Sequence, residues 1–134
     1  MAQEYIVNPC VGFNNVQLNE KREDVRIKLG QFNEFKKNKF SKNTSDDFGD
    51  IHVYYDENDT VEAVEFFEGE VFIRSDKLFP IDKTSLFEIL KEIDNNTVLT
   101  EDSISSKELC ISAYAPGEKA ESLLIYREDY FSIN

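Results

Sequence analysis

The strongest constraint on the fold is a run of strand-like segments separated by very short turns. Residues 51–55 (Ile-His-Val-Tyr-Tyr) are β-branched and aromatic, and residues 61–67 resume that character after the turn composition of residues 56–59. Glu68-Gly69 then leads into a third such segment, residues 70–74. Connections this short cannot support a parallel crossover, which needs about a dozen residues or more. The three segments are therefore predicted to form an antiparallel meander.

Two other segments have the spacing of helices. In residues 18–30, Val25 and Leu29 share one face, and Gly30 suits the position just after a helix end. A second helix is predicted from Thr84 to about Asp94, with an apolar side made of Leu86, Phe87, Ile89, Leu90 and Ile93. Three residues could form its N-cap: Asp82, Thr84 and Ser85.

The order of helix, loop and hairpin occurs twice. The second helix is followed by strand-like residues 109–114 and 121–126, joined by the hairpin loop 115–119. Matched positions are offset by 61, 60 and 59 residues, in the pairs Val25 and Leu86, Ile51 and Ile111, and Phe66 and Ile125. Either the chain is a tandem pseudo-repeat of units 18–79 and 80–131, or the recurrence is accidental. In both cases the units are too small to bury their faces alone and should share one core.

These elements predict an α+β fold in a single domain, residues 1–134: an antiparallel β-sheet with two helices. The remaining segments have no clear period. Residues 1–18 are mixed, residues 31–50 have loop composition with four phenylalanines, and residues 97–108 are predicted as a short extended piece followed by a loop.

Charge narrows the classes of partner. The chain has 27 acidic residues against 15 basic ones, a net charge of −12. Neutralising nucleic-acid phosphates needs a basic face, so direct nucleic-acid binding is not expected, and an anionic membrane surface is disfavoured for the same reason. No apolar run approaches the length of a membrane span, and the first residues do not resemble a signal peptide. A cytoplasmic location is expected, with Cys10 and Cys110 as free thiols, although a cystine between them is possible.

No catalytic or metal-binding set stands out. The single histidine, His52, lies in a predicted strand, where a structural or surface role is expected. Neighbouring carboxylates are abundant, but they occur in turns, where they are solvated. The segment 56–62 loosely resembles a calcium loop, yet it lacks the central glycine and has Phe67 where the late glutamate belongs. No cofactor, metal site or enzymatic activity is therefore predicted.

The remaining candidate is a surface at the tip of the first hairpin, where acids and aromatics are mixed. We predict that it binds a basic protein, since acidic surfaces steer basic targets and aromatic side chains anchor them. The candidate partner-binding residues are Tyr54, Tyr55, Asp56, Glu57, Asp59 and Glu62. The plainer interpretation is a solvated hairpin tip.

Several segments also resemble small bacterial proteins, some of them encoded as immunity partners of polymorphic or contact-dependent toxins. The likeness covers residues 10–75 and rests on Val11-Gly12-Phe13-x-x-Val16-x-Leu18, Arg22-Glu23-Asp24-Val25-x-x-x-Leu29-Gly30, Ile51-x-Val53-x-Tyr55-Asp56, Val64-Glu65-Phe66 and Gly69-x-x-Phe72. The tandem order is similar to that of β-lactamase inhibitory proteins and of small outer-membrane assembly lipoproteins, at the level of fold.

The net charge of −12, the missing catalytic set and this resemblance together predict a non-enzymatic immunity protein that binds and neutralises a cognate toxin domain. A basic nuclease is the natural target, because a site that attracts nucleic acid also attracts an acidic mimic. The alternatives are a stand-alone regulatory or scaffolding module that binds other proteins, and an enzyme with a carboxylate pair in a cleft.

Overall fold

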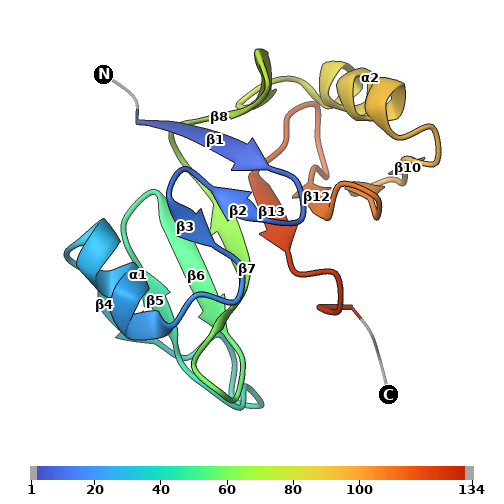
Figure 1. Cartoon of the computed structure of the whole chain (residues 1–134). Coiled ribbons are helices and arrows are strands. Elements are labelled where there is room, and N and C mark those ends of the chain that lie inside the picture. The colour runs from blue at the N-terminus through green and yellow to red at the C-terminus, as the bar shows by residue number, and fades with distance from the viewer. Residues whose placement is uncertain (1–2, 132–134) are drawn as a thin grey trace.

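The computed structural model describes residues 3–131, and β-strands dominate it (Figure 1). This part of the chain contains thirteen strands in two sheets of five and eight strands. Its two helices are short, with 8 residues in α1 (Arg22–Leu29) and 11 in α2 (Lys83–Ile93).

The smaller sheet joins the start of the chain to its middle. Its strand order is β3-β2-β1-β8-β9. β1 and β8 run parallel, with Tyr5 opposite Val71, and the other pairs in this sheet are antiparallel. Its strands are β1 (Glu4–Asn8), β2 (Gly12–Phe13), β3 (Val16–Gln17), β8 (Glu70–Ile73) and β9 (Asp76–Phe79).

The larger sheet is antiparallel throughout and has the order β10-β11-β12-β13-β7-β6-β5-β4. Both predicted hairpins are confirmed, and they meet where β13 pairs with β7. The strands are β10 (Val98–Leu99), β11 (Ser103–Ser106), β12 (Ile111–Tyr114), β13 (Ser122–Tyr126), β7 (Val61–Phe66), β6 (Ile51–Tyr55), β5 (Ser45–Asp47) and β4 (Asn33–Phe35).

The main core includes buried side chains from both sheets. Tyr5 of β1, Phe13 of β2 and Phe66 of β7 form an aromatic trio with ring centroids 5.3–5.8 Å apart. Two of the three pairs, Tyr5–Phe13 and Phe13–Phe66, are edge-to-face, and such pairs add roughly 0.5–1.5 kcal/mol each beyond the area they bury. The trio therefore ties the small sheet to the apolar face of the large one.

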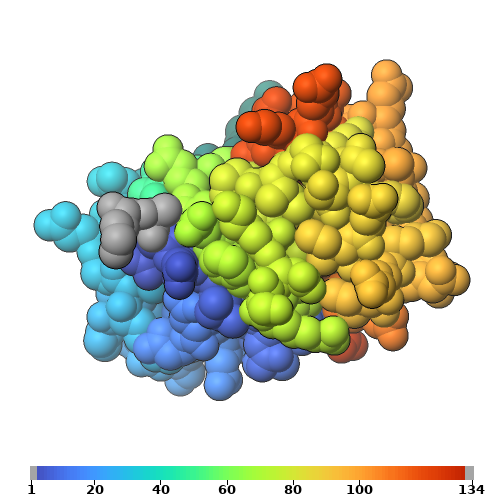
Figure 2. Space-filling view, turned by 90° about the horizontal axis from the view of Figure 1, so that it is seen from above, coloured from blue at the N-terminus to red at the C-terminus, as the bar shows by residue number. Residues whose placement is uncertain are grey.

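The helices match the predicted segments. Gly30 follows α1 with φ 88°, a conformation that suits glycine. The N-cap of α2 is Asp82, whose carboxylate accepts the backbone N–H of Ser85 at 3.0 Å. Figure 2 shows α2 beside the β8–β9 hairpin, and Leu86 and Leu90 are its fully buried side chains.

The predicted α+β fold class is wrong: the chain is mostly β, and units 18–79 and 80–131 are not tandem helix-plus-hairpin copies. The short extended piece predicted at the start of residues 97–108 is confirmed as β10, but the prediction missed the strands in residues 1–18 and 31–50, as well as β9 and β11. These missed strands are two to five residues long, and two of them, Ser45–Asp47 and Ser103–Ser106, are polar. Ladder hydrogen bonds to neighbouring strands hold them in place, so their own composition carries little strand signal.

The predicted partner of the third meander strand, residues 70–74, is also wrong. Residues 70–73 do form β8, but β8 pairs with β1 and β9 in the small sheet, not with β7. Val71 and Ile73 are buried in the main core. In this position β8 helps to cover the apolar face of the large sheet, which a third meander strand would have left open.

Candidate functional site

The two tyrosines of the predicted surface point to opposite faces of β6, as alternation along a strand requires. Tyr55 faces the main core, where its hydroxyl donates to Asp46 at 2.9 Å and the Arg22 guanidinium lies 4.1 Å from its ring centroid. Tyr54 faces the other side, where its hydroxyl donates to Glu65 at 2.5 Å. Both rings are at least 95% buried. Burial and the adjacent carboxylates raise the pKa of both hydroxyls, so they stay protonated donors.

The turn acids Asp56 and Asp59 are engaged in the structure of the hairpin. Asp56 accepts hydrogen bonds from the backbone and hydroxyl of Thr60 at 3.0 and 2.7 Å, and Arg127 donates to it at 2.8 Å. Burial opposes ionisation of Asp56, but these bonds outweigh it and lower its pKa to about 2. Asp59 accepts from the amide of Asn43 at 2.7 Å. Both carboxylates therefore fix the turn.

The other two acids differ in setting. Glu57 is exposed and forms an ion pair with Lys42 at 2.8 Å. Glu62 lies on β7, half-buried, and makes no ion pair within the described residues. Burial is the main cause of its raised pKa, to which the charge of Asp56 adds, while Arg127 and Lys37 act against the rise.

A surface hollow of about 830 Å³ lies beside this hairpin, and we call it the hairpin hollow. It brings together five of the six predicted residues, namely Tyr54, Tyr55, Asp56, Glu57 and Glu62. Asp59 instead borders a separate depression next to α1.

A cation already lies in the hairpin hollow. The ammonium of Lys37 is 4.2 Å from the ring centroid of Tyr54 and 5.8 Å from that of Tyr130, and it donates to the Tyr130 hydroxyl at 3.1 Å. A cation over an aromatic face gains roughly 0.5–2 kcal/mol, depending on its exposure. The hollow thus combines an aromatic face with the carboxylate of Glu62, a combination suited to a basic side chain.

Three lining residues were missed in the sequence. Lys37 is one of four lysines in residues 36–42, and no local sequence pattern marks Arg127 or Tyr130 as site residues. Arg127 reaches Asp56 across 71 residues of sequence and also pairs with Asp129 at 2.6 Å. Pairing of β13 with β7 brings this segment to the hairpin, which no local pattern could have indicated.

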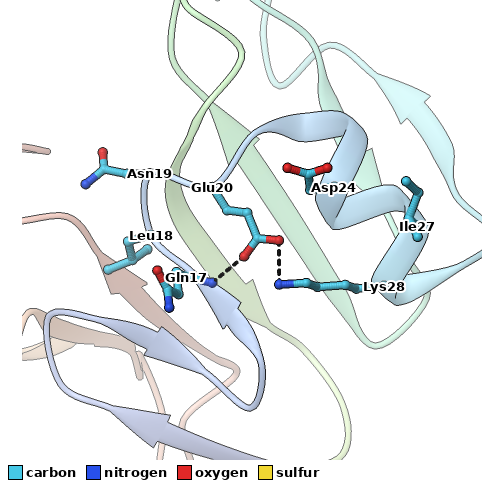
Figure 3. Close-up of a pocket in the computed structure, with 7 residues that line it drawn as sticks. All are labelled: Gln17, Leu18, Asn19, Glu20, Asp24, Ile27 and Lys28. Atoms are coloured by element: carbon cyan, nitrogen blue, oxygen red, sulfur yellow. Dashed lines mark hydrogen bonds and ion pairs between the residues drawn. The ribbon is translucent and has the colours of Figure 1, made fainter.

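A second hollow, of about 430 Å³, lies between β3 and α1 (Figure 3). Its central carboxylate, Glu20, accepts the backbone N–H of Gln17 at 2.9 Å and pairs with Lys28 at 2.7 Å. Glu20 is therefore engaged on both sides, and the other carboxylate that lines this hollow, Asp24, is an exposed side chain of α1.

The single histidine, His52, packs between two aromatic side chains. The His52 ring lies between the rings of Phe35 and Phe67, with centroids 4.7 and 4.6 Å away, and its Nε2 is 3.6 Å from Asp47.

Within residues 3–131, no group of three His, Cys, Asp or Glu side chains is arranged to hold a metal ion. No helix in the same range is long and apolar enough to cross a membrane.

A scan against protein-family models, a search of curated proteins and a search of solved structures each returned no match for this chain. The resemblance to immunity proteins and the partner-binding role of the hairpin residues therefore stay predictions.

Proposed function

We propose that this protein is a non-enzymatic, cytoplasmic immunity protein that neutralises a cognate toxin domain, with a basic nuclease as the toxin class. The hairpin hollow is its contact site. A lysine or arginine side chain of the toxin enters the hollow, displaces Lys37 from the face of Tyr54, and pairs with Glu62.

The observation that carries this proposal is the half-buried carboxylate of Glu62 beside an aromatic face. A carboxylate held partly out of water, without an ion pair in the described chain, gains more from an incoming cation than an exposed one does. The net charge of −12 supports the same partner class, because it steers basic proteins to the surface at long range.

The contacts of each acidic side chain decide which variants can test this proposal without disturbing the fold. Reversing Asp56 or Asp59 would break the turn as well as alter the surface, since both hold the hairpin together. Glu62→Lys and Glu62→Gln change the hollow with less damage to the fold. Glu88, an exposed residue of α2, provides the matched control Glu88→Lys.

Under this proposal the gene next to that of this protein encodes the toxin domain, and the test uses that domain. Its affinity for the wild-type protein and the variants is measured by isothermal titration calorimetry, and protection is measured by growth during co-expression. We expect Glu62→Lys to weaken binding by at least about 30-fold, the effect of losing one partner of a desolvated charge pair. Lys37→Ala should strengthen binding, because no internal cation then has to be displaced.

Two results would contradict this assignment. If Glu62→Lys and Glu88→Lys bind the toxin equally well, the contact site lies elsewhere. If a pull-down from the native strain recovers a regulatory protein and no toxin, the scaffolding alternative is favoured.

A further inference from the structure

The two cysteines, 100 residues apart in sequence, meet in space. Cys10 lies in the turn between β1 and β2, and Cys110 directly precedes β12. Their Sγ atoms are 2.7 Å apart. Bonded sulfurs lie roughly 2.0 Å apart, so a further approach of about 0.7 Å would close the bond.

Both turns hold the thiols in place. Cys10 and Cys110 have positive φ angles of 64° and 57°. The Cys10 thiol donates to the carbonyl of Glu108 at 3.3 Å, and the backbone N–H of Cys110 donates to Lys107 at 3.3 Å. The backbone N–H of Tyr126 on β13 donates to the carbonyl of Cys110 at 3.1 Å. These contacts keep the sulfurs facing each other.

The two thiols differ in access. Cys110 is 1% exposed and packs with Tyr54, Ala63 and Tyr126, whereas Cys10 is only half-buried. Burial, followed by the contact with Cys10, raises the pKa of the Cys110 thiol to about 12. An external reagent therefore reaches Cys10 first, and Cys110 acts as the resolving thiol.

We propose that Cys10 and Cys110 form a reversible disulfide that clamps the small sheet to the large one. The oxidant is a small-molecule disulfide such as glutathione disulfide. The Cys10 thiol gives up its proton to solvent and the resulting thiolate attacks one sulfur of glutathione disulfide. The glutathione S–S bond breaks, and one glutathione leaves as a thiolate that takes up a proton.

The second step closes the link. Cys110 gives up its proton to solvent and attacks Sγ of the mixed disulfide on Cys10, and the second glutathione leaves as a thiolate and is protonated. In total, two protein thiols are oxidised and one glutathione disulfide is reduced to two glutathiones.

The disulfide would close a loop of 100 residues that contains most of the fold. Bridges across long loops restrict the unfolded chain most strongly. In a reducing compartment the thiols stay reduced, so the link forms when the protein meets oxidising conditions. This inference is independent of the proposed immunity function.

The experiment incubates the purified full-length chain in glutathione redox buffers. We expect intact-mass spectrometry to show the loss of two hydrogens, no reactive thiol to remain after denaturation, and the melting temperature to rise by roughly 10 °C. Dithiothreitol should reverse all three changes. Cys10→Ser, at the half-buried position, should show none of them.

Other outcomes overturn the proposal. If the wild-type protein retains two free thiols in glutathione disulfide, or stops with one glutathione attached, the pair does not close. If Cys10→Ser gives the same rise in melting temperature as the wild type, the stabilisation has another source.

Discussion

Asp46 is a buried carboxylate that accepts three hydrogen bonds, and its replacement by alanine is expected to destabilise the fold. Asp46 lies on β5, fully buried, opposite Val53 of β6. It accepts hydrogen bonds from Nε and Nη2 of Arg26 at 2.7 and 2.8 Å and from the hydroxyl of Tyr55 at 2.9 Å. The carboxylate thereby links α1, β5 and β6.

The expected loss in the free energy of unfolding follows from the two groups that lose their partner, the Tyr55 hydroxyl and the Arg26 guanidinium. The Tyr55 hydroxyl would stay buried without its acceptor, which costs about 1–3 kcal/mol. The two bonds to the Arg26 guanidinium are charge-assisted and bidentate, and bonds of this kind contribute about 1.5–3 kcal/mol. Arg26 is partly exposed and keeps a contact with Glu34 at 3.3 Å, so the full sum is not reached. We expect Asp46→Ala to lower the free energy of unfolding by about 3–4 kcal/mol.

Urea denaturation followed by far-ultraviolet circular dichroism measures this loss. The matched control is Glu57→Ala, which breaks the exposed pair with Lys42 and should leave the unfolding midpoint essentially unchanged. Tyr55→Phe, which removes the hydroxyl and not the carboxylate, should cost less than Asp46→Ala. A loss below about 1 kcal/mol for Asp46→Ala would refute the assignment of this carboxylate as the link between α1 and the sheet.

Three further predictions concern the core and the turns. A Cβ at Gly12 would lie 2.1 Å from a backbone oxygen of β3, so Gly12→Ala should lower the free energy of unfolding, measured by thermal denaturation, by about 3 kcal/mol. Gly117 has open space around it, so the control Gly117→Ala should have no measurable effect. Phe66→Ala should cost about 3–5 kcal/mol in urea, and the more exposed Phe67→Ala clearly less. Folding lowers the pKa of Asp56 from 3.8 to about 2, so its ionised carboxylate stabilises the fold by about 2 kcal/mol above pH 4. This stabilisation is lost as the pH falls toward 2. Asp56→Asn should therefore flatten this part of the curve of unfolding free energy against pH.

Local chemistry accounts for the elements that were predicted correctly. The hairpins in residues 51–66 and 111–126 follow from β-branched and aromatic runs next to short turns. The two helices follow from the four-residue spacing of apolar side chains, and Gly30 ends the first of them. Each of these features depends on residues within about one turn or one hairpin of each other, and a sequence displays such relations directly.

The candidate site was only partly predictable. The turn composition marked the hairpin tip, and five of its six predicted residues do line one hollow. The sequence did not show that Tyr54 and Tyr55 are buried, or that Asp56 is engaged by Arg127. Such facts depend on which strand lies beside β7, and strand order is set by long-range pairing.

By itself, the sequence determined the acidic surface charge, the two hairpins, both helices and the types of side chain at the hairpin tip. Tertiary structure decided that β8 joins β1, that short polar strands extend the large sheet, and that Cys10 meets Cys110. The physical reason is the distance along the chain over which each effect acts. Propensity and periodicity act between near neighbours, whereas strand partners are chosen by covering apolar faces and completing hydrogen-bond ladders across the whole chain.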